Sequence, residues 1–240
     1  KNKVFSLTEI LDLLDDHPEI IEINKDCGIR FNKRFISQSE PKLKKITKVK
    51  TALIIGAGSI GQRHILNLKK IGINHITALR SKKGHFQNLP KTLGVNEVFN
   101  WEEVLNMKPD IAIISNPTSF HLDSALKISK IVKGIFIEKP LSNSLAGCNQ
   151  LIDILNANKI ISFVGHNLMF HPIIRKIIDF YNENDVGETI NFQCQVGQWL
   201  PDWHPYEDFT KAYYARKDLG GGVALTLIHE IHLALELAGL

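Results

Sequence analysis

Cysteine and long apolar runs are both scarce in this sequence. The three cysteines, Cys27, Cys148 and Cys194, lie far apart and form no C-x-x-C pair, which argues against a disulfide framework or a zinc ribbon, so we expect no metal site. No apolar run approaches the ~20 residues that a transmembrane helix needs. The N-terminal region lacks the basic, apolar and small-residue order of a signal peptide. These absences predict a cytoplasmic protein without a membrane partner.

An excess of charge of one sign is also lacking. The chain has 29 Lys and Arg residues against 25 Asp and Glu, a net charge of +4. A protein that follows nucleic-acid phosphates clusters its basic residues more sharply, so we expect no nucleic-acid partner, whereas the small excess suits an anionic cofactor. The 240 residues are 44% hydrophobic and 22% charged, which is typical of a globular protein with one or two domains.

Residues 1–48 are predicted to form an N-terminal extension and a linker. Ser6-Leu7-Thr8-Glu9 has the spacing of a helix capping box, and apolar residues follow it at a helical period. Ile20 to Ile23 is typical of a strand, and Gly28 to Phe35 of a turn and a second strand. The lysine-rich stretch from Pro41 to Lys50 indicates a solvated linker.

The pattern changes at Thr51, and residues 49–164 are predicted to form a doubly wound α/β domain. Short runs that are apolar throughout alternate with helical patterns, which is typical of a parallel sheet covered on both faces. The expected strands are Ala52–Ile55, Ile76–Leu79, Ile111–Ile114, Ile135–Ile137 and Ile160–Val164. The expected helices cover residues 59–71, 118–131 and 143–157.

Residues 165–240 follow another pattern, which predicts the start of an α+β domain. We expect a helix from His171 to Tyr181 and, because apolar and polar residues alternate, a half-exposed strand from Glu188 to Gln198. An irregular stretch from Leu200 to Leu219 comes next. Three glycines, Gly220 to Gly222, then precede a last helix from about Leu225 to Leu237.

The strongest functional signal is Gly56-Ala57-Gly58-Ser59-Ile60-Gly61. It follows an apolar strand and opens a helix, the context that separates a dinucleotide-binding loop from a chance G-x-G-x-x-G. In such a loop Gly56 permits a tight turn, Gly58 lets the backbone approach a pyrophosphate and Gly61 lets the helix pack on the strand. Ser59 and Ile60 offer N–H groups to the phosphates at the helix start. The alternative is a glycine-rich turn that binds nothing.

The end of the second expected strand bears on the choice between NAD and NADP. An NAD site has an acidic residue there, but this sequence continues with Arg80-Ser81-Lys82-Lys83. Arg80 and Ser81 are suited to a 2′-phosphate, and we therefore favour NADP over NAD. A basic turn on the surface is the alternative.

Two further segments follow expected strands and should meet the glycine loop at the carboxyl edge of the sheet, where open α/β sheets bind ligands. From the first, Ser115 to His121, the candidate cofactor contacts are Ser115, Asn116, Pro117 and His121. The second is Glu138-Lys139-Pro140, in which Glu138 is a further candidate. A lysine at such a strand end can exchange a proton with a substrate oxygen.

Taken together, these motifs and the later Gly-Gly-Gly helix resemble the glucose–fructose oxidoreductase/inositol dehydrogenase (Gfo/Idh/MocA) family over about residues 50–240. Gly165 to Pro172 resembles the family's first segment beyond the nucleotide domain. Leu200 to Pro205, Tyr213 to Arg216 and Gly220 to Glu230 resemble a branch that handles sugars. The resemblance implies a Rossmann domain followed by a domain with a large open sheet, which carries the substrate site and often an oligomer interface. We therefore expect a homo-oligomer, and we expect the second domain to be incomplete in this chain.

The resemblance also implies roles for individual residues. Lys139 matches the active-site lysine of the family and would stabilise a developing alkoxide. His229 best matches its catalytic histidine, and a histidine with an ordinary pKa near 6.5 exchanges protons near neutral pH. Asn167, Trp203 and Glu230 are candidate substrate contacts, although the ring of Trp203 is equally suited to packing.

Two functions follow as hypotheses. The first is an NAD(P)-dependent oxidoreductase that acts on a secondary alcohol or ketone of a sugar or sugar derivative. The second is a non-catalytic dinucleotide-binding sensor or regulatory protein, because one fold hosts many functions. The second is favoured by Thr226 and His232, which stand where the resembled pattern has aspartate. Met169 also departs from it, standing where arginine is common.

Overall fold

The computed structural model describes residues 21–24, 28–31, 49–81, 92–182, 190–205 and 207–238. The capping box at Ser6, the linker up to residue 48, and the basic residues Lys82 and Lys83 lie outside these ranges. The chain divides into two compact units, residues 1–44 with 176–191 and residues 45–175 with 192–240. In the first unit, β1 (Ile21–Asn24) and β2 (Gly28–Phe31) overlap the two segments in which strands were expected, and the structure pairs them antiparallel. No helix in the described ranges is long and apolar enough to cross a membrane.

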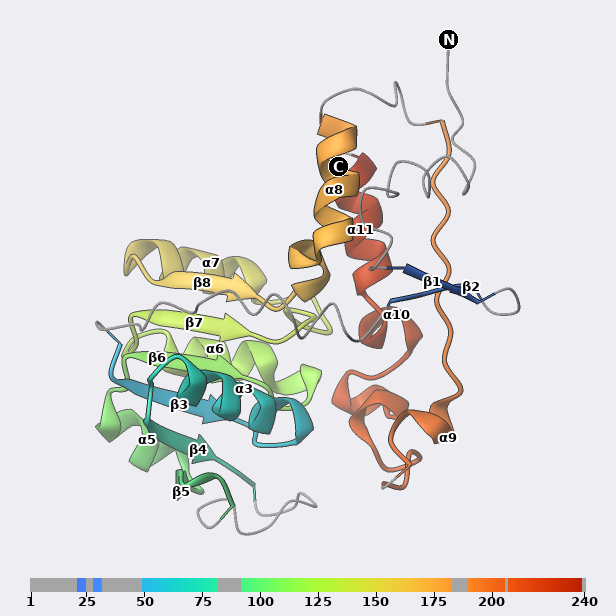
Figure 1. Cartoon of the computed structure of the whole chain (residues 1–240). Helices are drawn as coiled ribbons and strands as arrows, with labels where there is room; N and C mark the ends of the chain where they lie inside the picture. Colours follow the sequence, from blue (N-terminus) through green and yellow to red (C-terminus); the bar gives the residue numbers. More distant parts are fainter. Residues whose placement is uncertain are drawn as a thin grey trace. The chain divides into compact units, whose positions relative to one another are not determined.

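The second unit is built on a six-stranded sheet in the order β5-β4-β3-β6-β7-β8, in which every neighbouring pair is parallel (Figure 1). The prediction of a doubly wound parallel sheet is confirmed. The strands are β3 (Thr51–Ile55), β4 (His75–Leu79), β5 (Asn96–Val98), β6 (Ile111–Ile114), β7 (Gly134–Ile137) and β8 (Ile161–Val164). Five of the six were expected. The short strand β5 was not, because only Val98 among its three residues is buried.

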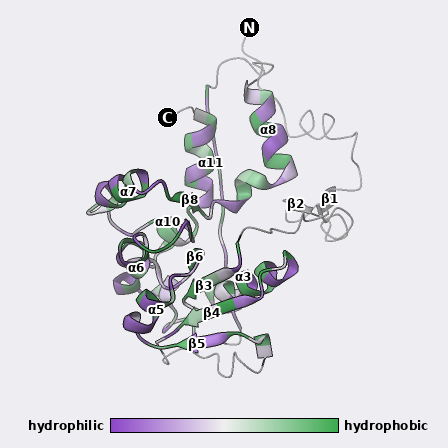
Figure 2. Ribbon diagram, turned by 90° about the vertical axis from the view of Figure 1, so that its left-hand side faces the viewer, coloured by the Kyte–Doolittle hydropathy of each residue, from purple (hydrophilic) through white to green (hydrophobic). Residues whose placement is uncertain are grey.

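Helices cover both faces of this sheet because alternate residues of each buried strand point to opposite sides. On one face Leu53 and Ile55 belong to a core cluster with residues of α5, α6 and α7, and on the other face Ala52 and Ile54 pack with Ile65 of α3. Figure 2 shows the apolar strands between helices that carry polar residues as well. The helices are α3 (Ser59–Lys70), α5 (Trp101–Met107), α6 (His121–Ile128) and α7 (Cys148–Ala157).

Helix boundaries differ from the predictions in two places within the sheet domain. The expected helix 118–131 begins with a 3-10 turn, η2 (Thr118–Phe120), before α6 starts at His121. The expected helix 143–157 starts only at Cys148, after Gly147, which adopts a left-handed backbone conformation with a φ of 85°. A left-handed residue interrupts a right-handed helix, so the segment before Gly147 is a turn.

The segment after β8 consists mostly of short elements. These are η3 (Asn167–Phe170), α8 (Pro172–Asn182), α9 (Leu200–Trp203), η4 (Tyr213–Ala215), η5 (Lys217–Leu219), α10 (Val223–Thr226) and α11 (His229–Ala238). The expected helix at 171–181 is confirmed as α8. The expected last helix is instead two helices, because Leu227 leaves the helical region, with a ψ of 46°, at the end of α10.

The predicted strand from Glu188 to Gln198 is wrong for its described part, because residues 190–198 form no regular element. Ile190 and Val196 are 64% and 45% exposed. A strand is stabilised by the ladder of hydrogen bonds to a neighbour, and no described strand pairs with this segment. The alternation of apolar and polar residues is therefore not sufficient to form a strand in this segment.

At the amino edge of the sheet, Asp110 ties three strands together. Its Oδ2 accepts hydrogen bonds from the backbone N–H groups of Lys50 and Thr51, at 2.9 and 3.1 Å, and from Oγ1 of Thr51. Its Oδ1 accepts one from Nζ of Lys133 at 2.6 Å. The hydrogen bond from Lys133, followed by those from the two backbone groups, holds the pKa of Asp110 well below its ordinary value. The carboxylate thus joins the starts of β3, β6 and β7.

Candidate active site

The carboxyl edge of the sheet aligns five segments of the chain in one row. The residue that follows each of β3, β4, β6, β7 and β8 donates a backbone hydrogen bond to the last residue of a neighbouring strand, at 2.8 to 3.0 Å. The donors, in order across the sheet, are Arg80, Gly56, Ser115, Glu138 and Gly165, and their acceptors are Val98, Leu79, Ile55, Ile114 and Ile137. The glycine loop, the Ser115 segment and the Glu138-Lys139-Pro140 segment, predicted separately, are therefore neighbours in space.

Two glycines explain why the glycine loop is able to fold tightly. Gly56 has a φ of 90°, a conformation that glycine adopts without strain. A Cβ on Gly61 would lie 2.1 Å from the carbonyl oxygen of Gly56, so α3 reaches the loop only with glycine there. Ser115 fastens the arrangement by donating from Oγ to that same oxygen at 2.7 Å. The roles predicted for Gly56 and Gly61 match this packing.

Gly58 faces open space at the start of α3. A Cβ at this position would meet no atom within 4 Å. The first turn of α3 contains no acidic residue, and no side chain caps it. Free N–H groups and the positive end of the helix dipole favour an anion at such a terminus. The residues here, including Ser59 and Ile60, thus fit the pyrophosphate of a dinucleotide.

Arg80 stands at the end of β4, where the sequence placed it, and it forms an ion pair with a residue that the sequence did not single out. Its Nη1 donates to Oε1 of Glu97 on β5. Both side chains are mostly buried, at 8% and 14% exposure. Ser81, the next candidate, is exposed. The basic group at this edge is therefore accompanied by a carboxylate.

His121 connects the Ser115 segment to the Glu138-Lys139-Pro140 segment from inside the protein. The ring is 1% exposed, and its Nδ1 and Nε2 lie 2.8 Å from the carbonyl oxygens of Pro140 and Asn116 respectively. Burial lowers the pKa of His121, and the two carbonyl groups oppose the shift. The neighbouring Asn116 donates to Ser124 through Nδ2 at 2.9 Å. His121 and Asn116 thus fix the conformation of the carboxyl edge. Pro117 lies between them in the sequence, just before η2.

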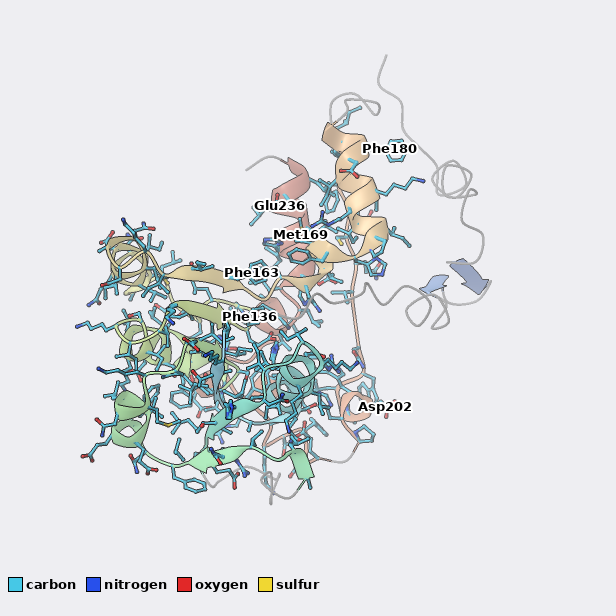
Figure 3. The ribbon with its side chains drawn as sticks, turned by 60° about the vertical axis from the view of Figure 1, so that its left-hand side comes forward. Phe136, Phe163, Met169, Phe180, Asp202 and Glu236 are labelled. Carbon is cyan, nitrogen blue, oxygen red and sulfur yellow. The ribbon has the colours of Figure 1, made fainter. Side chains whose placement is uncertain are left out.

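Glu138 pairs with His64 of α3, a contact that spans 74 positions of sequence. Nε2 of His64 lies 2.7 Å from Oε1 of Glu138, and both side chains are largely buried. Burial opposes the ionisation of Glu138, but the hydrogen bond and charge of His64 outweigh it and keep the pKa of Glu138 below its ordinary value. His64 also packs edge-on against Phe136 at a centroid distance of 5.0 Å. Figure 3 labels Phe136 and its neighbour Phe163 on the adjacent strand.

Lys139 reaches from the end of β7 to helix α10. Its Nζ donates to the carbonyl oxygen of Thr226 at 2.6 Å. Burial lowers the pKa of Lys139, and the charges of Glu138 and Glu230 act in the opposite direction. Through its contact with Thr226, which lies 87 positions later in the sequence, Lys139 belongs to a polar cluster built from distant parts of the chain. Its peptide bond to Pro140 is cis.

Three histidines complete this cluster. His166 stacks on His232, with ring centroids 3.8 Å apart and planes within 4°, and meets His229 edge-on at 6.2 Å. Burial, followed by the nearby His232, His229 and Lys139, lowers the pKa of His166 to about 4. Burial and then Lys139 also lower the pKa of His229. Both His166 and His229 are therefore neutral near pH 7.

Five buried side-chain nitrogen and oxygen atoms in the described part of the chain have no hydrogen-bond partner, and all belong to this region. They are Oδ1 of Asn116, Oγ of Ser119, Nδ1 of His166, Oγ1 of Thr226 and Nδ1 of His229. Buried polar groups without a partner are costly and rare in native proteins. Their concentration at one edge singles it out as a candidate ligand site.

The candidate substrate residues have diverse surroundings. Asn167 is exposed at the start of η3. Trp203 packs against His204 and Tyr214, with centroid distances of 5.4 and 5.0 Å. Glu230 lies on α11 directly after His229. Met169, labelled in Figure 3, lies on η3 just beyond β8. Within the ranges that the structure describes, no three His, Cys, Asp or Glu residues are arranged to hold a metal ion.

Sequence comparison relates the chain to NAD-binding oxidoreductases. Residues 50–166 match the oxidoreductase family with an NAD-binding Rossmann fold. A myo-inositol 2-dehydrogenase of Thermotoga maritima is 27% identical over 190 residues, which are 78% of this chain and 54% of that protein. An NAD(+)-dependent scyllo-inositol 2-dehydrogenase of Bacillus subtilis is 26% identical over 144 residues, 58% of this chain and 42% of that protein. The chain thus spans about half the length of these relatives.

Solved structures show the same fold at lower identity. An NAD-binding protein from Listeria innocua superposes with a TM-score of 0.59 at 18% identity, covering 78% of this chain and 54% of that one. GenD2 from gentamicin A biosynthesis, solved in complex with NAD, superposes with a TM-score of 0.63 at 17% identity, covering 83% of this chain and 56% of that one.

Proposed function

The chain belongs, through residues 50–166, to the Gfo/Idh/MocA family of NAD-binding oxidoreductases, and on that premise we propose that it transfers a hydride between a nicotinamide cofactor and a secondary alcohol or ketone of a sugar or sugar derivative. The observation that carries the proposal is the row of segments at the carboxyl edge. This row places two features at the same edge of the sheet: the start of α3 at Gly58, which faces open space, and the partly buried Lys139.

The cofactor would be held mainly by backbone groups. Gly58, Ser59 and Ile60 line the start of α3 and would receive the pyrophosphate, and Asn116 offers a buried amide oxygen without a partner for the remainder of the molecule. A bound nicotinamide supplies the capacity to accept or give a hydride. The protein would orient the cofactor and the substrate and would supply the groups that accept or donate a proton.

Lys139 and His229 are the proposed catalytic residues. The ammonium group of Lys139 would stabilise negative charge that develops on the substrate oxygen. His229 is neutral near pH 7, because burial and then Lys139 lower its pKa, and a neutral imidazole is able to accept a proton from a hydroxyl group. Asn167, Trp203 and Glu230 are proposed to contact the substrate. Two inositol dehydrogenases among the relatives support a polyhydroxylated ring as the substrate class.

One observation favours a second function, a dinucleotide-binding sensor or regulatory protein without catalysis. The ammonium group of Lys139 is already bonded to the carbonyl oxygen of Thr226, and Thr226 stands where the resembled pattern has a carboxylate. A threonine cannot take up a proton, so the local acid–base chemistry differs from that of an aspartate. Binding of the cofactor without turnover of any sugar would support this alternative.

A titration of the full chain with NADH and with NADPH, measured by isothermal titration calorimetry, tests the proposal. Gly58→Ala should weaken the binding of the preferred cofactor at least about tenfold, or by about 1.4 kcal/mol, because its Cβ would occupy the space open to the pyrophosphate. Gly197→Ala is the matched control, since a Cβ at exposed Gly197 also meets nothing within 4 Å. No binding by the unaltered chain would refute the proposal, as would equal binding by the two variants.

A further inference from the structure

The carboxylate that is missing from the end of β4 is supplied by the neighbouring strand. Arg80 stands where an NAD site has its acidic residue, and the side chain that meets its guanidinium is Glu97 of β5. Ala78 of β4 and Glu97 of β5 are paired in the sheet register. The acid is thus remote in sequence but adjacent in the fold.

The Arg80–Glu97 pair lies immediately beside the glycine loop. The backbone N–H of Gly56 donates to the carbonyl oxygen of Leu79 at 3.0 Å, and the next residue, Arg80, donates from its own N–H to Val98 at 3.0 Å. Two consecutive residues at the end of β4 therefore bond the loop on one side and β5 on the other. A dinucleotide whose pyrophosphate lies at Gly58 would extend its adenosine ribose over this strand end.

We propose that Glu97 is a specificity-determining residue, which holds Arg80 as an ion pair and thereby directs the site to NAD(H) rather than NADP(H). The inference rests on the proposed function, because it concerns the same cofactor site. It also alters the expectation from the sequence, in which Arg80 alone favoured NADP.

Electrostatics and hydrogen bonding both support this role. A 2′-phosphate carries a charge of about −1.5 to −2 near pH 7, so it would be repelled by Glu97 and would compete with it for Arg80. A 2′-hydroxyl group carries no charge, donates one hydrogen bond and accepts others. A carboxylate that accepts and a guanidinium that donates are together complementary to a ribose diol. The paired side chains are also mostly buried, where charge interactions are screened less than at an exposed site.

The test compares the dissociation constants of NADH and NADPH for the full chain and its Glu97→Gln variant. The substituted amide would retain the shape and one acceptor oxygen of the carboxylate but lose its charge, so the ratio of the two constants should move toward NADPH by about tenfold. Asp153→Asn, which removes an exposed carboxylate from α7, is the control and should leave the ratio unchanged. Thermal unfolding of each variant checks that it is folded.

The outcomes separate this inference from the proposed function. An unaltered protein that prefers NADH, with a shift toward NADPH in Glu97→Gln, supports the role of Glu97. An unaltered protein that prefers NADPH overturns that role without any variant, as does an unchanged ratio in a folded Glu97→Gln. In both of these cases the proposed function stands, because a nicotinamide cofactor still binds. Failure to bind either cofactor overturns the proposed function itself and this inference with it.

Discussion

Strand β7 has a lysine just before its first residue and another two positions beyond its last, and the two lysines have opposite surroundings. Lys133, at the amino edge, is 79% exposed and pairs with Asp110. Lys139, at the carboxyl edge, is partly buried, its Nζ is bonded to a backbone carbonyl oxygen, and burial lowers its pKa. The lysine at the amino end of the strand is thus exposed to solvent, whereas the lysine at its carboxyl end is partly buried and has a lowered pKa.

The difference extends to the two edges of the sheet. At the amino edge, each oxygen of the Asp110 carboxylate has a hydrogen-bonding partner. At the carboxyl edge, and in the loops and helices packed on it, lie all five of the buried side-chain polar atoms that lack a partner among the described residues. We therefore propose that the amino edge serves stability and the carboxyl edge ligand binding, and this contrast can be tested residue by residue.

The largest expected effect is on turnover. Lys139→Ala should reduce turnover of a sugar or cyclitol substrate by about 10²-fold, the usual scale for the loss of an acid–base group, while cofactor binding changes little. Lys133→Ala is the matched control and should leave turnover unaltered. The measurement is hydride transfer followed by the absorbance of the reduced cofactor. Equal turnover in the two variants would remove the functional distinction between the edges.

The next effect in size is on stability. Asp110→Ala removes the carboxylate that joins three strands and should lower the free energy of unfolding by about 2 kcal/mol, as expected for hydrogen bonds to a charged group. Asp123→Ala, at an exposed ion pair with Lys127 on α6, should cost less than about 1 kcal/mol. Urea unfolding of both variants gives the comparison. A loss of cofactor affinity in folded Asp110→Ala would contradict the assignment of this edge to stability.

The smallest expected effect is the change that one substitution makes in the pH dependence of stability, a dependence that originates at the carboxyl edge. The pKa of His166 falls from its ordinary 6.5 to about 4 on folding. Between these two values the unfolded chain binds a proton that the folded protein does not, so stability decreases as the pH falls from 6.5 to about 4. His121 and His229, whose pKa values are also lowered by burial, act in the same direction.

Unfolding midpoints in urea at pH 7, 6 and 5 measure this dependence. In His232→Gln the ring that stacks on His166 is absent, and since His232 is one cause of the low pKa of His166, the decrease of stability with falling pH should become shallower. The control is His75→Gln, at an exposed position at the start of β4, which should keep the original slope. A steeper slope in His232→Gln would contradict the electrostatic interpretation of the stack.

The sheet and its glycine loop were predictable because their signals are local. A run such as Leu53 to Ile55 is apolar at every position, since both faces of its strand are covered, and the glycines of the loop follow it directly. The roles predicted for Gly56 and Gly61 depend on backbone geometry that only glycine adopts or fits. Strand β5 lacked such a signal, because it has three residues and only Val98 among them is buried.

The rest of the site could not be predicted because its partners are distant in sequence. His64 and Glu138 are 74 positions apart, and Glu97 meets Arg80 only because β5 lies beside β4. The alternation that predicted a strand from Glu188 to Gln198 describes which face of the segment is apolar. A strand also needs a neighbouring strand to complete its hydrogen bonds. Patterns along one segment carry no information about that neighbour.

The buried ring of His121 has a mechanical consequence for the carboxyl edge. It pins the loop at Asn116 to the loop at Pro140, with a ring nitrogen opposite a carbonyl oxygen of each. Loops that are fixed in this way lose their conformational freedom when the chain folds and not when a ligand arrives, which increases affinity through preorganisation. The two loops, one beside the glycine turn and one carrying Lys139, therefore share one buried contact, and we expect a substitution at His121 to disturb both of them.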